Sequence, residues 1–146
     1  MSLRQQIIDA IEIALREIRD PRPVLVTREP FEPEKLAITQ FPAILINFFD
    51  EERETTTMGL PSVGRRAGNI RFELRTFVRG TELDKRKNDI LEAVEDALDR
   101  DRYLGLRTEG VTDSQVELIE NVPRLAPLAE QRIVYRVRYN YVRGTQ

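Results

Sequence analysis

Carboxylates are the side chains of this sequence that most suggest chemistry. Acidic residues crowd positions 84–101, and carboxylates of this kind are the usual protein ligands of Mg²⁺. The group comprises Asp84, Asp89, Glu92, Glu95, Asp96, Asp99 and Asp101. At helical spacing these side chains spread around a polar face instead of converging on one point. We therefore interpret them as a solvated helix surface and predict no metal site.

The residue types on which most enzymes depend are missing. The sequence contains no His and no Cys. This excludes Ser-His-Asp and Cys-His catalytic groups, disulfides and Cys-based metal sites. Neither G-x-x-x-x-G-K-[ST] nor G-x-G-x-x-G occurs, so no phosphate-binding or dinucleotide-binding loop is indicated. We predict that the protein is not an enzyme and needs no cofactor.

Arginines form a second group with regular spacing. Arg71, Arg75 and Arg79 are separated by even numbers of residues, and so are Arg132, Arg136 and Arg138. In a strand such residues share one face, because successive side chains alternate between faces. A basic face can bind nucleic acid, but here Glu73 interrupts it, base-stacking aromatic residues are lacking and the net charge is −2. We expect no sequence-specific nucleic-acid binding.

Two amphipathic helices and about five strands are predicted to position these residues. Apolar residues recur at helical spacing in residues 3–18, which Ser2 and Gln5 would cap, and in residues 81–100, for which Thr81 is the expected N-cap. Strand patterns cover residues 24–27, 43–49, 69–79, 115–121 and 132–143. Residues 43–49 are apolar at both parities, which predicts a central strand covered on both faces.

The order of these segments predicts an α+β fold in a single domain of 146 residues. Two helices should pack on one face of a mostly antiparallel, roughly five-stranded sheet, in the order α-β-β-β-α-β-β. No apolar run is long enough to span a membrane, and the first ten residues do not form a signal peptide. We therefore expect synthesis in the cytosol and no membrane association.

The sheet face away from the helices is predicted to be an interface between proteins. Faces that mix arginine with aromatic and branched residues are typical of interfaces, although a solvated face is the alternative. The candidate contact residues on this face are Arg71, Arg75, Phe77, Arg79, Arg132, Val134, Arg136 and Arg138.

Residues 50–68 show neither helical nor strand periodicity, and we interpret them as a long loop that becomes ordered at a contact with another subunit. The loop has an acidic start, a small apolar tip and a basic end. Its candidate contact residues are Asp50, Glu51, Glu52 and Glu54, then Met58, Leu60 and Val63, then Arg65 and Arg66.

The whole layout resembles the tail terminator proteins, also called minor tail or tail completion proteins, of long-tailed bacteriophages. The resemblance lies in patterns of residue type and order that span nearly the whole chain. They are Leu3-Arg4-Gln5-Gln6-Ile7-Ile8-Asp9-Ala10, Phe41-Pro42-Ala43-Ile44-Leu45-Ile46, the Arg79-Gly80 strand end, Ile90-Leu91-Glu92-Ala93-Val94 and Tyr135-Arg136-Val137-Arg138-Tyr139.

This resemblance implies a structural virion protein without catalytic residues. Such subunits assemble in the host cytoplasm into a homo-oligomeric ring, expected to be a hexamer, at the head-proximal end of the tail. The ring sits on the tail tube protein, stops its polymerisation and offers a surface to the head-completion or neck protein. Genomic DNA only passes through the lumen.

Two alternatives belong to other classes. One is a different head–tail joining protein, such as a neck or connector subunit. The other is a small host α+β ligand-binding module.

Overall fold

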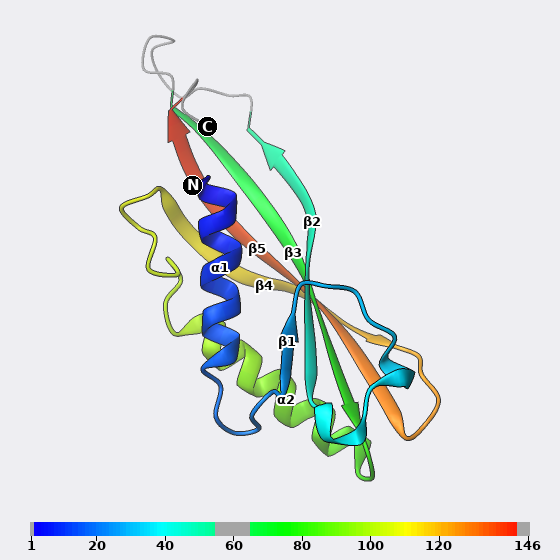
Figure 1. Cartoon of the computed structure of the whole chain (residues 1–146). Helices are drawn as coiled ribbons and strands as arrows, with labels where there is room; N and C mark the ends of the chain where they lie inside the picture. The colour runs from blue at the N-terminus through cyan, green and yellow to red at the C-terminus, as the bar shows by residue number, and fades with distance from the viewer. Residues whose placement is uncertain (1, 55–64, 143–146) are drawn as a thin grey trace.

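The computed structural model describes residues 2–54 and 65–142 and has the predicted α+β fold (Figure 1). In these residues, α1 (Leu3–Arg16) and α2 (Leu83–Asp99) pack on a five-stranded sheet. The strands are β1 (Leu25–Thr27), β2 (Ala43–Arg53), β3 (Arg65–Arg79), β4 (Val111–Val122) and β5 (Leu128–Val142). Their order across the sheet is β1-β2-β3-β5-β4, with β1 parallel to β2 and the other neighbours antiparallel.

Helix α1 begins where the sequence predicts. The side-chain oxygen of Ser2 accepts a hydrogen bond of 3.2 Å from the backbone N–H of Gln5, which satisfies one free donor of the first turn. One stripe of the helix is buried, as its periodicity predicts, and consists of Leu3, Ile7, Ile11 and Leu15.

Helix α2 begins one residue later than the predicted N-cap implies. Its N-cap is Glu82 in a left-handed conformation with φ of 54°, so the prediction of Thr81 as N-cap is wrong. Gly80 has φ of +132°, a backbone conformation that favours glycine. The turn that starts at this residue leads the chain from β3 into the helix. The backbone oxygen of Thr81 instead accepts a hydrogen bond from Arg86 at 2.6 Å.

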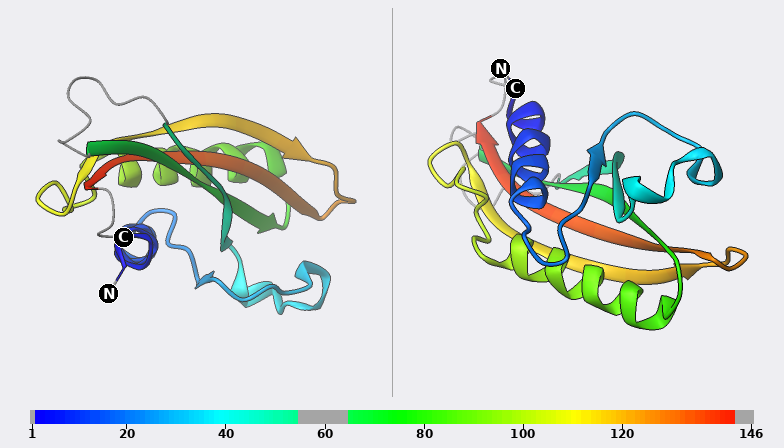
Figure 2. Two further views of the ribbon diagram at one scale, coloured as in Figure 1. Left: turned by 90° about the horizontal axis from the view of Figure 1, so that it is seen from above. Right: turned by 60° about the horizontal axis from the view of Figure 1, so that its bottom comes forward.

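The main core lies between the sheet and both helices, because the buried residues of α1 and α2 join one cluster with the same sheet face. The strands contribute Ile44, Ile46, Ile70, Phe72, Leu74, Ile133, Tyr135, Val137 and Tyr139 to it, among others. The alternation predicted for β3 and β5 is therefore confirmed. Figure 2 shows α2 lying along the twisted sheet beside β4 and β5.

A second, smaller core lies on the other face of the sheet. Residues 28–42, which include the short 3-10 helices η1 (Pro33–Lys35) and η2 (Ile38–Gln40), cover the start of β2 and the end of β3. Phe31 packs edge-on against Phe77 with ring centroids 5.1 Å apart. Strand β2 lies between β1 and β3 and is covered on both faces over residues 43–46, as predicted for a central strand, whereas Phe48 and Phe49 farther along it are exposed.

Residues 50–68 are not one long loop, because both ends of this range belong to strands. Residues 50–53 belong to β2 and residues 65–68 to β3. Asp50 pairs with Arg71 in the β2–β3 ladder and Arg53 pairs with Gly68, while β3 already begins at Arg65. Polar side chains hide the strand pattern here, yet the backbone pairs with its neighbours regardless of side-chain polarity. Residues 55–64, including Met58, Leu60 and Val63, lie outside the described residues.

Candidate interface on the open sheet face

Beyond the segment 28–42, no other part of residues 2–54 and 65–142 covers the sheet face opposite the helices. We call the part formed by Phe49, Arg71, Glu73, Leu118, Arg132, Val134 and Arg136 the open face. The strand register places Arg75 opposite Arg132, Arg71 opposite Arg136 and Asn69 opposite Arg138. The prediction that the arginines of β3 and β5 share one face is confirmed.

Like charges directly opposite each other destabilise a sheet, so these arginine pairs need compensation. Carboxylates on the same sheet face supply this compensation. Glu73 bonds Arg132 at 2.5 Å and lies 4.0 Å from Arg75, and Glu120 of β4 bonds Arg132 at 2.6 Å. The Glu73 and Glu120 hydrogen bonds raise the pKa of Arg132, although partial burial acts in the opposite direction.

The ion pairs continue through Glu130 toward the lower end of the sheet in Figure 1, where β2 begins and β3 ends. This carboxylate is fully buried and bonds both Arg75 and Arg124, the latter at 2.8 Å. Arg124 in turn bonds Glu34 of η1 at 2.7 Å. The chain of alternating charges ties the segment 28–42 to β3 and β5, and it neutralises the arginines that it includes.

At the upper end, a β-bulge in β2 places two consecutive side chains near the open face. Phe48 pairs with Phe72 and Asp50 with Arg71, so Phe49 is the extra residue. Asp50 accepts a hydrogen bond of 2.7 Å from Arg71, and this contact lowers the pKa of Asp50. Farther up, Arg138 bonds Glu54 at 2.7 Å.

The bulge puts the ring of Phe49 between two guanidinium groups. Arg132 lies 4.9 Å and Arg71 5.3 Å from the ring centroid. The ring nevertheless remains 44% exposed. Leu118 of β4, which β3 and β5 separate from β2, is 47% exposed on the same face. An aromatic ring fixed by cation–π contacts, together with an exposed aliphatic side chain on the same face, can bind a protein surface with little loss of side-chain entropy.

Arg136 differs from the other arginines of the open face. Within the described residues it makes no ion pair, and its cross-strand neighbours are Arg71 and Gln115. It is half-buried. Arg136 is therefore the uncompensated cation of a face whose other charges are paired, so it is suited to bind a carboxylate or carbonyl oxygen of a partner.

Other predicted contact residues are buried or lie elsewhere. Phe77 is 1% exposed beneath the segment 28–42, and Val134 is buried among its neighbours on the open face, so the expectation that these two side chains are accessible is wrong. Arg79 lies at the lower end of β3, where it lines two cavities. The side chain of Arg65 lies outside the described part, whereas Arg66 pairs with Tyr141 in the β3–β5 ladder and Glu52 with Asn69 in the β2–β3 ladder.

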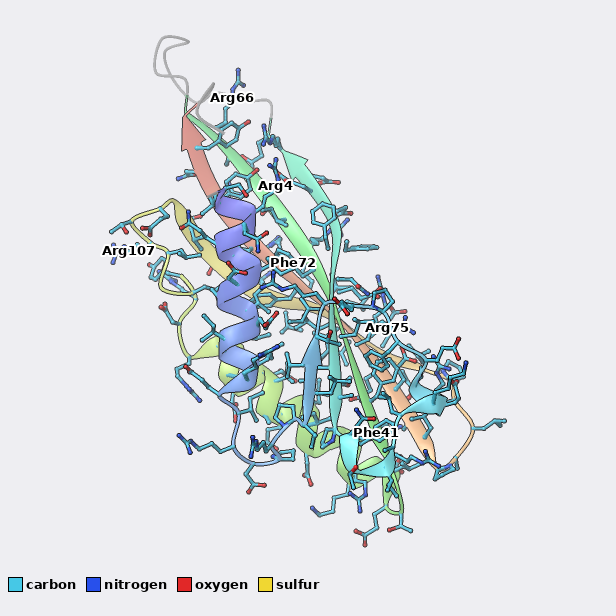
Figure 3. The ribbon with its side chains drawn as sticks, in the orientation of Figure 1. Arg4, Phe41, Arg66, Phe72, Arg75 and Arg107 are labelled. Carbon is cyan, nitrogen blue, oxygen red and sulfur yellow. The ribbon has the colours of Figure 1, made fainter. Side chains whose placement is uncertain are left out.

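Glu51 belongs to the helix side and not to the predicted interface. It bonds Arg4 of α1 at 2.5 Å and accepts a hydrogen bond from the hydroxyl of Tyr139. Burial acts to raise the pKa of Glu51, but the Arg4 and Tyr139 hydrogen bonds outweigh it and lower the pKa. This carboxylate therefore fastens α1 to the upper end of the sheet (Figure 3 labels Arg4).

Sequence reasoning missed Glu130 and Leu118 as residues of this face and its supports. Glu130 has the same parity as Arg132, which is the signal that could have found it. Leu118 could not be assigned to a face, because a second bulge shifts the register between Val116 and Leu118.

Within residues 2–54 and 65–142, no three His, Cys, Asp or Glu side chains are grouped so that they could hold a metal ion. None of the helices described is both long and apolar enough to span a membrane. No protein-family model matches the chain, and no curated protein matches its sequence significantly.

Proposed function

We propose that this protein is a bacteriophage tail terminator subunit. It forms a closed homo-oligomeric ring, expected to be a hexamer, on the head-proximal end of the tail tube. The ring stops polymerisation of the tube and offers a surface to the head-completion or neck protein. The protein has no catalytic role and acts in the virion after assembly in the host cytoplasm.

The observation that carries the contact part of this proposal is the open face. Phe49 and Leu118 are exposed on the same sheet face as Arg136, which makes no ion pair within the described residues, whereas the opposite sheet face is filled by the helices. Head-to-tail contacts need two unlike adhesive surfaces on each subunit and close into a ring when the rotation divides the circle, and the open face supplies one such surface. The tail assignment itself rests on the resemblance of sequence patterns.

The charge pattern favours a protein partner over a polyanion. Arg71, Arg75 and Arg132 each have a carboxylate partner, so a phosphate backbone would have to compete with internal ion pairs. Nucleic-acid binding also requires many free cations, because its affinity comes largely from released counterions. DNA is therefore proposed to pass through the ring without specific contacts.

The direct test is negative-stain electron microscopy of the purified protein, alone and mixed with the tail tube protein of the same genome. Rings on one end of each tube, and tubes that no longer elongate, are the expected result. A protein that stays monomeric and leaves tube growth unchanged would refute the proposal. Binding to DNA-filled heads but not to tails would instead identify another head–tail joining protein.

A further inference from the structure

Two cavities meet at the lower end of the sheet and share one residue, Arg79. One has a volume of about 410 Å³ and lies between η1 and the β4–β5 hairpin, where Pro33, Leu125 and Pro127 line it. The other has a volume of about 320 Å³ and is lined by Ile38, Phe41 and Val78, among others. Figure 3 shows Phe41 at this end, well below Arg75.

The charge of Arg79 is not compensated by the described residues. The guanidinium is half-buried and takes part in no ion pair there, although other charged groups surround the cavities. Glu34 and Arg124 bond each other, and Asp89 bonds Lys85. Arg79 is thus the one charged group lining both cavities, and it is available to a ligand.

The cavity walls are largely apolar on both sides of this cation. Ile38 is 64% exposed at one cavity and Leu125 is 91% exposed at the other. Ligand sites typically have volumes of roughly 300–1,000 Å³, apolar walls and a few polar groups that fix orientation. A ligand complementary to this site would have a carboxylate to bind the guanidinium and an apolar group on each side of it to enter the two cavities.

We propose that this end of the molecule binds an extended peptide segment of a partner protein, with an Asp or Glu for Arg79 and apolar side chains for the two cavities. In an extended chain, alternate side chains point the same way. The matching pattern is therefore apolar-x-acid-x-apolar, which a compact small molecule cannot reproduce across both cavities. The site is separate from the open face and does not depend on the proposed ring.

The probe is the blocked peptide acetyl-Leu-Ser-Asp-Ser-Trp-amide, because the protein itself contains no Trp and the fluorescence then reports the peptide alone. Full-length protein should produce a saturable blue shift of its emission. The same peptide with Asn in place of Asp should bind at least about tenfold more weakly, since it loses a charge-assisted hydrogen bond.

Variants locate the binding. Arg79→Gln should weaken binding of the Asp peptide about tenfold, whereas Arg107→Gln, at an exposed arginine that Figure 3 shows far from these cavities, should leave it unchanged. Ile38→Ser and Leu125→Ser should each weaken binding severalfold. Their side chains are exposed, so these two variants keep the fold even if Arg79→Gln does not.

Absence of saturable binding up to roughly millimolar peptide would overturn the proposal. Equal affinity for the Asp and Asn peptides would also overturn it. So would binding that none of the Arg79, Ile38 and Leu125 variants weakens, or that Arg107→Gln weakens as much as Arg79→Gln does. None of these outcomes bears on ring formation, which is measured separately.

Discussion

At the scale of single residues, Gly68 shows how closely the upper end of the sheet is packed. A Cβ at this position would lie 2.6 Å from Cζ and Oη of Tyr139, nearer than real Cβ atoms come to another atom. Tyr139 cannot move away easily, because its ring is buried and its hydroxyl bonds Glu51. Only glycine therefore fits here without displacing the tyrosine.

We predict that Gly68→Ala lowers the free energy of unfolding by about 1–3 kcal/mol, the usual cost of overpacking. Urea denaturation measures the loss. In a Tyr139→Val background the ring is gone, and the same substitution should cost clearly less. Equal costs in both backgrounds would show that the close contact with Tyr139 is not the cause.

The two buried tyrosines, Tyr135 and Tyr139, should make the stability of the protein depend on pH in the alkaline range. Burial raises the pKa of Tyr135 from 10.0 to about 12, and burial together with the Glu51 hydrogen bond raises that of Tyr139 from 10.0 to about 12. Between these pH values the folded state retains protons that the unfolded chain has lost. Stability should therefore be intact below pH 10 and fall as the pH rises toward 12.

Urea denaturation at steps from below pH 10 to pH 12 tests this dependence. Tyr135→Phe should decline less steeply than the wild type, because one shifted group is removed. A wild-type free energy of unfolding that stays constant over the range would contradict the prediction.

At the scale of elements, the segment 28–42 decides whether the lower part of the sheet is surface or core. Its side chains Phe31, Leu36 and Phe41 cover Phe77 and Leu45. The ion pair between Glu34 of this segment and Arg124, which also bonds the buried Glu130, ties it to the β4–β5 hairpin. The segment is thus part of the folded unit, although it contains only short 3-10 turns.

We predict that Phe77→Ala costs about 3–5 kcal/mol of unfolding free energy, as for other buried phenylalanines, and that Phe77→Glu prevents folding. Phe49→Ala is the matched control on the same sheet face and should cost about 1 kcal/mol or less, because its ring is half exposed. Circular dichroism and urea denaturation of the purified variants distinguish the two positions. A folded, stable Phe77→Glu would show that the segment does not seal this side.

At the scale of the whole molecule, the helices and the open face give the subunit two unlike sides. The main core fills one side of the sheet, and the second core fills only part of the other. The remaining surface has its charges largely paired within the chain, so its contacts should depend more on Phe49 and Leu118 than on long-range attraction. Assembly through this face should therefore resist moderate salt.

We predict that Phe49→Asp and Leu118→Asp each weaken subunit assembly at least about tenfold while the monomer stays folded. Size-exclusion chromatography with light scattering measures assembly, and circular dichroism checks the fold. Ile13→Asp is the matched control, because Ile13 is an exposed apolar residue on the outer side of α1. Assembly that Ile13→Asp disrupts and the open-face variants do not would place the contact on the helices.

The helices, most of the strands and the side chains that share a face within each strand could be predicted from the sequence alone. The stripe from Leu3 to Leu15 and the alternation of Ile70, Phe72 and Leu74 are local patterns with a fixed geometric period. The common face of Arg71 and Arg75 within β3, and that of Arg132 and Arg136 within β5, follow from the same period. Such features need only the conformation of one segment, which its own residues specify.

Contacts between distant segments set which of these residues are accessible and which charges are paired. Phe77 is buried because residues 28–42 fold over it, and the polar ends 50–53 and 65–68 are strands because neighbouring backbones pair with them. Glu130 neutralises Arg75 across 55 residues of sequence, while Arg79 and Arg136 on the same sheet face find no such partner among the described residues. Burial and charge compensation depend on contacts between distant segments, and the periodicity of a single segment carries no information about them.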